Sequence, residues 1–149
     1  MFVVNVEGAI FQNDKWLVIE RGAEETHAAG TLSFVGGTVE QEGFSQDILE
    51  RTLSREIDEE VGVRIKEKLH FVHSSSFVTD EGRPVINIVF LCEYDQGTAF
   101  RKSPGEVAAV SWMTTEEILR HPKTPPWMYD SAKRADRLLK EIHADRLGT

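Results

Sequence analysis

Apolar and polar residues alternate along much of the chain, with the two-residue period that is typical of half-buried strands. The first two such runs are separated by Asn13-Asp14, a pair that favours a turn. A later pair is separated by the turn Asp80–Pro84, and its second run is rich in β-branched residues. The predicted strands are 2–11, 15–21, 31–35, 64–78, 85–94 and 107–113.

A period of three to four residues predicts three helices. The first spans 47–61 and is followed by Gly62, which is suited to end a helix in the left-handed conformation. A short helix is predicted after Thr114, which can form a capping box with Glu117, and His121-Pro122 should stop it. The last helix covers 128–146. The apolar residues at helical spacing are Leu49, Leu53, Ile57 and Val61 in the first helix, and Ala135, Leu138, Leu139 and Ile142 in the last.

Strands and helices are mixed without a strict strand–helix–strand alternation. This order predicts an α/β (α+β) fold in which a mixed sheet is sandwiched between helices. The chain has 149 residues and 40% hydrophobic content, with no internal repeat or change of composition. We therefore expect a single domain over 1–149.

The formal net charge of −8 narrows the choice of partners. Nucleic acid and anionic membranes both require a basic patch, so neither is expected as a partner. A nucleotide remains compatible if bound cations attract its phosphates. The N-terminus reads as a strand and not as a signal peptide, and no apolar run approaches the roughly 18 residues of a membrane span. A cytoplasmic protein is expected, with Cys92, its only cysteine, buried in the core.

Three carboxylates are concentrated near the end of the first predicted helix. Glu56 and Glu60 are four residues apart and Glu59 is three from Glu56, so all three project over an arc of about 100°. Like charges at this spacing destabilise a helix by about 0.2–0.5 kcal/mol per pair. A hard divalent cation such as Mg²⁺ or Mn²⁺, which prefers oxygen ligands, would offset that repulsion. The cluster therefore predicts a metal site.

A plain acidic interaction surface is the alternative interpretation of this cluster. It leaves Gly36-Gly37 and Gly62 unexplained. Histidine offers no competing metal site, because His70 and His73 are three apart in a predicted strand and should point to opposite faces.

The segment 55–63 reads Arg, Glu, aliphatic, any residue, Glu-Glu, any residue, Gly, aliphatic, which resembles the second half of the Nudix hydrolase signature. The segment 32–40, with its double glycine, resembles the opening of that signature. The early strand at 15–21 and the late strand and helix at 107–118 also resemble their counterparts. The resemblance covers most of the chain and implies a Nudix-type α/β/α sandwich.

Three departures from the family pattern stand out. Val35 replaces the usual proline, and Asp47 replaces a glutamate. We expect Asp47 to cap the helix or to hold Arg55 through a charge-assisted bond. The loop 38–46 is longer than in the common pattern, and we expect its residues 41–44 to lie beside the site.

The resemblance also implies roles for individual residues. Glu56 and Glu60 become the main metal ligands, Glu59 a further ligand or the base, and the carbonyl of Gly36 a backbone ligand. Glu106 is the candidate for a further metal ligand or the general base from a distal loop, with an ordinary exposed carboxylate as the alternative, and Glu40 is a second candidate.

For substrate binding, Arg21 is expected to reach a phosphate and Phe34 to stack on a base. Phe44 and Trp127 could also stack, and packing is the alternative for each aromatic.

The implied activity is divalent-metal-dependent hydrolysis of a nucleoside diphosphate linked to another group, through attack of water on phosphorus. A nucleoside triphosphate is the first expected substrate, and ADP-ribose or a nucleotide sugar is the alternative. A catalytically inactive nucleotide-binding module is a third hypothesis, against which the presence of all three glutamates argues. The bond cleaved and the oligomeric state, monomer or homodimer, stay open at this point.

Overall fold

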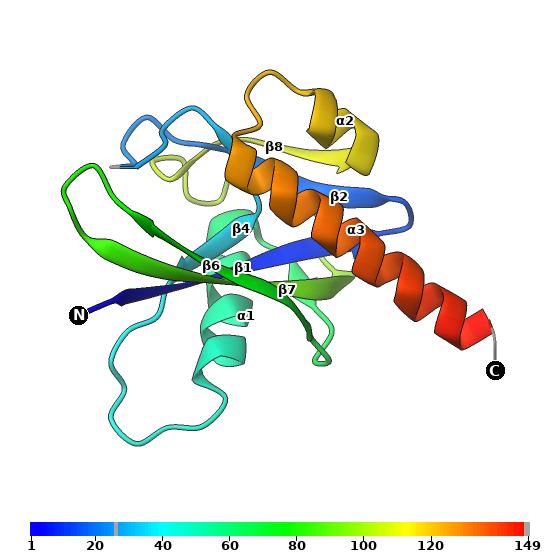
Figure 1. The fold of residues 1–149 in the computed structure, drawn as a ribbon, viewed down its shortest axis with the longest axis horizontal. Helices are drawn as coiled ribbons and strands as arrows, with labels where there is room; N and C mark the ends of the chain where they lie inside the picture. Colours follow the sequence, from blue (N-terminus) through cyan, green and yellow to red (C-terminus); the bar gives the residue numbers. More distant parts are fainter. Residues whose placement is uncertain (26, 148–149) are drawn as a thin grey trace.

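The structure, a computed structural model, describes residues 1–25 and 27–147. In this part of the chain eight strands and three helices form (Figure 1). Their bounds are β1 Val3–Gln12, β2 Lys15–Arg21, β3 Leu32–Ser33, β4 Val35–Thr38, α1 Ile48–Val61, β5 Arg64–Ile65, β6 His70–Val78, β7 Pro84–Gln96, β8 Val107–Thr114, α2 Thr115–Arg120 and α3 Pro126–Leu147.

The sheet is mixed, as the sequence predicts. β1 lies at its centre and runs parallel to β7, whereas it is antiparallel to β2 and β4. β2 also pairs with β3 and β8, and β7 also pairs with β5 and β6, all antiparallel. The parallel pair β1–β7 thus joins two otherwise antiparallel groups of strands.

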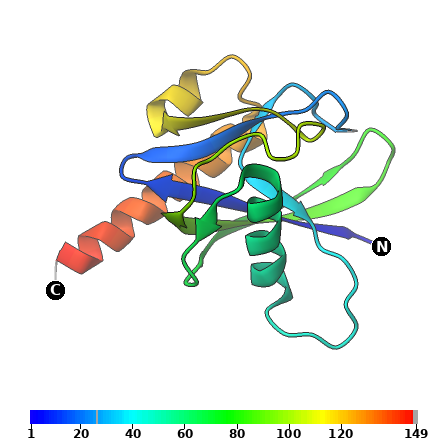
Figure 2. The same cartoon turned by 180° about the vertical axis from the view of Figure 1, so that it is seen from behind.

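The two long helices cover opposite faces of this sheet. α3 crosses in front of it in Figure 1, and α1 lies in front when the molecule is turned around in Figure 2. α2 lies beside β8 and contacts α3. This arrangement confirms the predicted α/β/α sandwich.

A separate hydrophobic cluster lies under each helix, because successive residues of β1 and β7 point to opposite faces. Val6 and Ile10 of β1 pack toward α1, and Ala9 packs toward α3. Burying one large aliphatic side chain stabilises the fold by about 1.5–3 kcal/mol, so these clusters fix both helices on the sheet. The α1 cluster includes Leu53, Ile57, Val61 and Cys92, and the α3 cluster includes Leu91, Met128, Ala132 and Leu139.

Two predicted strand boundaries are wrong. Gly36 and Gly37 do not follow a strand but lie inside β4, where they pair with Glu7 and Val6 of β1. The segment 64–78 is not continuous, because it divides into β5 and β6.

A bulge in β6 overturns the prediction for the two histidines. The register shifts between Phe71 and His73, so His70 pairs with Leu91 and His73 with Val89. Both partners belong to the α3 cluster. The extra residue therefore turns both histidines to the α3 side, where His73 Nε2 lies 2.9 Å from Ser131 Oγ.

The start of α1 also differs from the prediction. Asp47 has a left-handed backbone (φ 54°) and its side chain makes no cap hydrogen bond. Arg55 instead pairs with Glu56 and Glu59, so neither expected role of Asp47 is found. The end agrees with the prediction: Gly62 (φ 69°) is left-handed and its N–H donates to the carbonyl of Asp58.

The remaining helix predictions hold closely. The capping box of Thr114 and Glu117 begins α2. α3 begins at Pro126, two residues before the predicted start. The connection from β4 to α1 extends away from the sheet in both views, and Phe44 within it is fully exposed (Figures 1 and 2).

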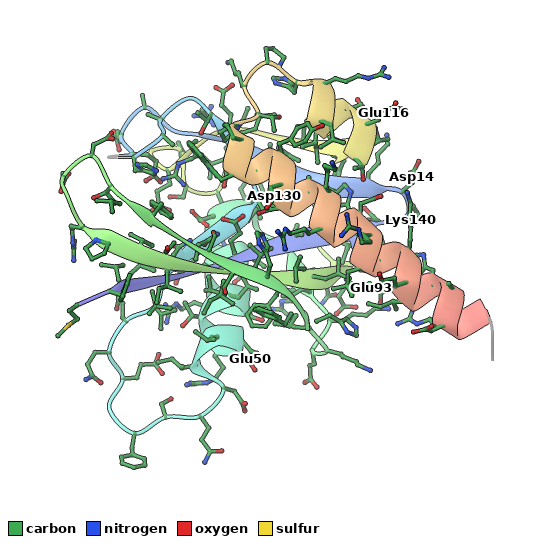
Figure 3. The ribbon with its side chains drawn as sticks, viewed as in Figure 1. Asp14, Glu50, Glu93, Glu116, Asp130 and Lys140 are labelled. Carbon is green, nitrogen blue, oxygen red and sulfur yellow. The ribbon has the colours of Figure 1, made fainter. Side chains whose placement is uncertain are left out.

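Acidic side chains are spread over several outer surfaces of the molecule. Figure 3 shows Glu50 on α1, Glu116 on α2 and Asp130 on α3. No helix in the described part of the chain is both long and apolar enough to cross a membrane. Cys92 is buried, as predicted, and burial raises the pKa of its thiol well above the usual range.

Candidate functional site

A cleft of about 400 Å³ lies where β4, α1 and the two loops around Glu24 and Gly105 meet. Of the described residues that line it, seven are glutamates, whereas Arg21 is the one lysine or arginine. The glutamates are Glu7, Glu24, Glu25, Glu40, Glu56, Glu60 and Glu106.

α1 places Glu60 at the inner end of this cleft. The buried neighbours Ile57 and Val61 hold the helix on the sheet, and Glu60 is only 6% exposed. Its Oε2 is buried and accepts no hydrogen bond from any described residue. A buried carboxylate without a partner is costly, so this oxygen requires either a proton or a cation.

The electrostatic surroundings of Glu60 also favour a bound proton or cation. The pKa of Glu60 is raised to about 9, chiefly by burial. A hydrogen-bond interaction with Glu106 and the negative charges of Glu106, Glu56 and Glu25 add to the shift. Two carboxyl groups can form a hydrogen bond only when one is protonated. In the absence of a cation, Glu60 is therefore the group that holds a proton at neutral pH.

Glu56 lies one turn before Glu60 and is half-buried. Burial and the neighbouring charge of Glu59 raise its pKa, whereas Arg55, with Nη2 3.6 Å from Glu56 Oε1, opposes the shift. Arg55 thus orients this carboxylate at the edge of the cleft.

The two glycines of β4 make room for different neighbours. A Cβ on Gly36 would overlap the carbonyl oxygen of Val6 and the backbone of Glu7, so a side chain there would separate β4 from β1. A Cβ on Gly37 would overlap the carboxyl group of Glu56. Glycine at these positions therefore permits both the strand pairing and the approach of α1.

Glu106 reaches the cleft through an interlocked pair of loops. The N–H of Gly22 donates to the carbonyl of Glu106 (2.8 Å), and a Cβ on Gly22 would overlap the carbonyl of Gly105. Glu106 is an exposed residue, but its carboxyl group interacts with that of Glu60. The structure thus brings it together with Glu56 and Glu60.

Arg21, at the end of β2, lines the same cleft. Its Nη2 lies 3.3 Å from Glu25 Oε2, and its Nε donates to the carbonyl of His27 (3.0 Å). The guanidinium is therefore held in place beside the glutamates.

Two predicted elements, Glu59 and residues 41–44, lie outside the cleft, and Phe34 borders it with its ring in the core. The side chain of Glu59 is 60% exposed and pairs with Arg55 Nε at 3.9 Å. The ring of Phe34 is 1% exposed and packs against Trp16 in the core, so a base cannot stack on it without opening the core. Residues 41–44 do not line the cleft, contrary to the expectation for the long loop.

Sequence reasoning missed Glu7, Asn5 and Asn87. Glu7 lies at the wall of the cleft, where burial raises its pKa to about 7 although the Asn87 hydrogen bond and Arg21 oppose the shift. Asn5 and Glu7 precede Ala9 on one face of β1, and Asn87 lies between Val85 and Val89 on the same face of β7. Polar residues at core-facing positions of an alternating strand were the available signal.

The donor set fits a hard divalent cation. In residues 1–25 and 27–147, no three His, Cys, Asp or Glu side chains converge tightly enough to enclose an ion as they stand. The cleft nevertheless offers carboxylate and backbone oxygens, which Mg²⁺ and Mn²⁺ prefer. The partnerless Oε2 of Glu60 is where such an ion would replace the proton.

Comparison with known proteins identifies a family whose model matches the chain. The family model of the NUDIX domain matches residues 1–135. No curated protein matches the chain.

Solved structures share the fold. A MutT NUDIX hydrolase from Burkholderia pseudomallei is 21% identical with a TM-score of 0.76, over 90% of this chain and 98% of that one. A MutT protein from Methanosarcina mazei Go1 is 24% identical with a TM-score of 0.76, over 93% and 96%. The NUDIX domain of Shewanella oneidensis NrtR, solved with ADP ribose, is 15% identical with a TM-score of 0.70, over 95% and 89%.

Proposed function

The chain belongs to the NUDIX domain family, and on that premise we propose that it hydrolyses a nucleoside diphosphate linked to another group, with the help of a divalent metal ion. As an enzyme of this kind, it cleaves a phosphoanhydride bond by attack of water on phosphorus. The observation that carries the proposal is the buried, partnerless Oε2 of Glu60 in a cleft lined by glutamates. α3 continues past residue 135 and buries Leu139, which supports one unit over 1–149.

Glu56, Glu60 and the carbonyl of Gly36 would hold Mg²⁺ or Mn²⁺. Bound there, the ion would polarise a phosphoryl oxygen and lower the pKa of a bound water. Glu59 lies next to Glu60 on α1, and its carboxylate would join this set only after a change of rotamer.

The other groups of the cleft have separate tasks. Glu106, on the loop opposite α1, would take the proton of the attacking water, which requires it to be ionised. Arg21 would bind a phosphate oxygen through its guanidinium. Because seven glutamates surround this single cation, an anionic substrate would enter only with bound metal.

A nucleoside triphosphate is the first proposed substrate. ADP-ribose or a nucleotide sugar is the second, and two observations favour it. The NrtR NUDIX domain with the same fold was solved with ADP ribose. The acidic cleft also adjoins a second cavity of about 370 Å³, which gives room for a group beyond the phosphates.

Calorimetric titration with Mn²⁺ tests the metal site. We expect the wild type to bind the ion and Glu60→Gln to lose at least tenfold in affinity, because the variant keeps the shape but not the charge. Glu50→Gln is the matched control, since Glu50 is on the same helix but outside the cleft. Equal affinity of the wild type and Glu60→Gln would refute the assignment.

A product screen in the presence of Mg²⁺ tests the activity. Nucleoside triphosphates, ADP-ribose, sugar nucleotides and dinucleoside polyphosphates are each incubated with the wild type and with Glu60→Gln as the blank. We expect at least one compound to be cleaved only by the wild type. If the protein binds Mn²⁺ and nucleotide but cleaves none of them, the inactive binding module is the better description.

A further inference from the structure

β7 is apolar on both of its faces, but only one face is covered. On the α3 side every second residue from Val85 to Leu91 is buried, whereas on the α1 side Ile86, Ile88 and Phe90 are only half-buried. A strand with one face in water normally alternates apolar with polar residues, and apolar residues on both faces are typical of a strand that is covered on both sides. The sequence of β7 therefore predicts a second cover, which no element in residues 1–25 and 27–147 supplies.

The missing cover is explained by the position of α1. α1 packs mainly against β4, β1 and β5, whereas α3 packs against β6 and β7. The α1 side of the β6–β7 hairpin is therefore left without a helix, and in Figure 2, which shows this side, the hairpin projects beyond α1. We call this surface the open face. It consists of Val4 of β1, Phe71 and Val78 of β6, and Ile86, Ile88 and Phe90 of β7.

The register of the strands places these side chains together, because paired residues of adjacent strands point to the same side of a sheet. Val4 pairs with Ile86 across β1 and β7, and Phe71 pairs with Phe90 across β6 and β7. The rings of Phe71 and Phe90 pack edge to face, with centroids 6.5 Å apart. Phe71 is nevertheless 59% exposed and Val78 is 63% exposed, so the open face presents large apolar side chains to solvent.

The open face also lacks charge. Neither β6 nor the part of β7 from Pro84 to Cys92 contains Asp, Glu, Lys or Arg, although 28% of the chain is charged and its net charge is −8. Exposed strands ordinarily carry charged side chains that prevent association. Here such protection is missing, and a basic protein or a charged membrane finds no group to bind. The cover that fits this face is another apolar, uncharged surface.

We propose that the open face is the contact surface of a symmetric homodimer, in which the open faces of two copies pack on each other. A two-fold axis brings a surface onto the same surface of its partner, so each copy supplies the apolar, uncharged cover that the other one needs. The contact closes on itself and leaves neither open face exposed. Two sheets packed in this way lie about 10 Å apart.

The dimensions of the open face agree with such a contact. It spans three strands and about seven residues of β7, which is roughly 20 Å by 14 Å. This suits the apolar core of a homodimer interface, which covers about 800 Å² per partner and has a polar rim. The loop 38–46 leaves the sheet beside the open face, because the N–H of Val39 donates to the carbonyl of Val4 (2.8 Å). This loop and its fully exposed Phe44 are therefore available for the rim.

The mass in solution is the first test. Sedimentation equilibrium is measured from about 1 to 100 µM, since interfaces of this size bind with micromolar or tighter affinity. We expect the wild type to reach twice the mass of one chain, and Phe71→Asp and Val78→Asp to keep the mass of one chain throughout, because each would bury an unpaired charge. A wild type that stays monomeric at 100 µM overturns the proposal, as does a dimer that both variants retain.

Folding and position are controlled separately. Phe71 and Val78 are largely exposed in one copy, so both variants should keep the circular dichroism spectrum of the wild type. Tyr129→Asp is the matched control, because Tyr129 is 42% exposed but lies on α3, on the opposite side of the sheet. It should dimerise like the wild type. Loss of the dimer in Tyr129→Asp as well would mean that the open face is not the specific contact.

Thiol protection distinguishes packing of the faces from pairing of the β6 edges. Ser74 and Ser75 are adjacent and exposed, but Ser74 pairs with Ile88 of the open face and Ser75 with Asn87 on the other side. We expect Ser74→Cys to react with a thiol reagent at least fivefold more slowly at 100 µM than at 1 µM protein, and Ser75→Cys to react equally fast at both. The buried Cys92 of the wild type gives the background. Equal protection of both cysteines, or of neither in a dimeric sample, refutes the proposed face.

Salt dependence gives an independent test. Each copy has a net charge of −8, so two copies repel each other and the contact between them has no ion pair in its apolar core. Added salt screens this repulsion, and about 0.5 M NaCl should therefore strengthen the dimer. A dimer that dissociates in NaCl would be held together by ion pairs on another surface, and the proposal would fail.

Discussion

The carboxyl group of Glu56 occupies the space that a side chain at position 37 would need, so Gly37 and Glu56 are in direct steric competition. Gly36, the preceding residue, is constrained mainly by backbone, namely the carbonyl oxygen of Val6 and the Cα of Glu7, to which the Glu7 Cβ is attached. The two adjacent glycines therefore serve different purposes: Gly36 preserves the strand pairing, and Gly37 preserves the position of a candidate metal ligand.

We predict that Gly37→Ala separates activity from stability. The new methyl group must displace the flexible end of Glu56, which costs the fold little, and the free energy of unfolding should change by less than about 1 kcal/mol. A misplaced ligand should nevertheless lower kcat/KM by about 10- to 100-fold. Thermal melting and steady-state kinetics on one preparation measure both.

Gly36→Ala is the matched comparison for this variant. Its methyl group meets the Val6 carbonyl and the backbone of Glu7, which cannot move without opening the β1–β4 pairing. A loss of about 1–3 kcal/mol of unfolding free energy is expected. Equal stability of the two variants would contradict the distinction drawn between the two glycines.

The pH dependence of stability should reveal the proton on Glu60. Its pKa is raised from 4.5 to about 9 in the folded protein, so the folded state holds an extra proton between these values. The free energy of unfolding contributed by this group therefore falls as the pH rises from 4.5 to about 9. Denaturation of metal-free wild type and Glu60→Gln at pH 5, 7 and 9 measures this contribution. The free energy of unfolding of the variant, relative to that of the wild type, should increase as the pH rises.

Glu7 provides an internal reference for that experiment. Burial raises the pKa of Glu7 to about 7, so its contribution to the free energy of unfolding also falls as the pH rises, but at lower pH than that of Glu60. This contribution is the same in the wild type and in Glu60→Gln. The difference between the two proteins therefore belongs to Glu60 and to Glu106, Glu56 and Glu25, which face it. Added Mn²⁺ should make the wild type more stable than Glu60→Gln, because the ion stabilises only the wild type. Parallel pH curves would show that Glu60 is ionised in the metal-free cleft.

Glu106→Gln tests the general base. If Glu106 takes the proton of the attacking water, kcat should fall by more than tenfold, a barrier increase above about 1.4 kcal/mol, with little change in Mn²⁺ affinity. A variant that keeps kcat within about tenfold excludes Glu106 as the essential base. Glu40→Gln should be examined in parallel, because Glu40 lines the cleft and is the next candidate.

Gly62→Ala should destabilise α1 at its end. Gly62 has a φ of 69°, and a Cβ there would also meet the ring of Phe100. A left-handed non-glycine residue costs about 1–2 kcal/mol. Gly43→Ala is a suitable control, since Gly43 has the same φ of 69° but open space around it. Urea denaturation should show the larger loss for Gly62→Ala, and equal losses would mean that Phe100 moves aside freely.

Local patterns predicted most of the elements. The strand 15–21 agrees with β2 residue for residue, and the capping box of Thr114 and the left-handed Gly62 are both present. In each case the relevant interactions lie within a few residues of the chain. The family signature likewise directed attention to Glu56 and Glu60, whose spacing on α1 is itself local.

Features that depend on distant partners were not predictable in this way. The bulge after Phe71 reverses the face expected for one histidine, and it shows only when β6 is aligned with β7. Gly36 and Gly37 were expected to follow the strand 31–35, and only their pairing with β1 places them inside β4. Asn5 and Asn87 are 82 residues apart, and only the parallel register of β1 and β7 makes them the floor of a cavity.

The parallel pairing of β1 with β7 also bears on how the protein is made. One edge of β1, from Val3 to Phe11, finds its partner only in residues 85–93. Such non-local pairing is slow, because a long loop must close before any contact repays its entropy. During synthesis β1 must therefore keep the backbone N–H and C=O groups of this edge unpaired until residues 85–93 have left the ribosome, and such an unpaired edge favours aggregation of the nascent chain.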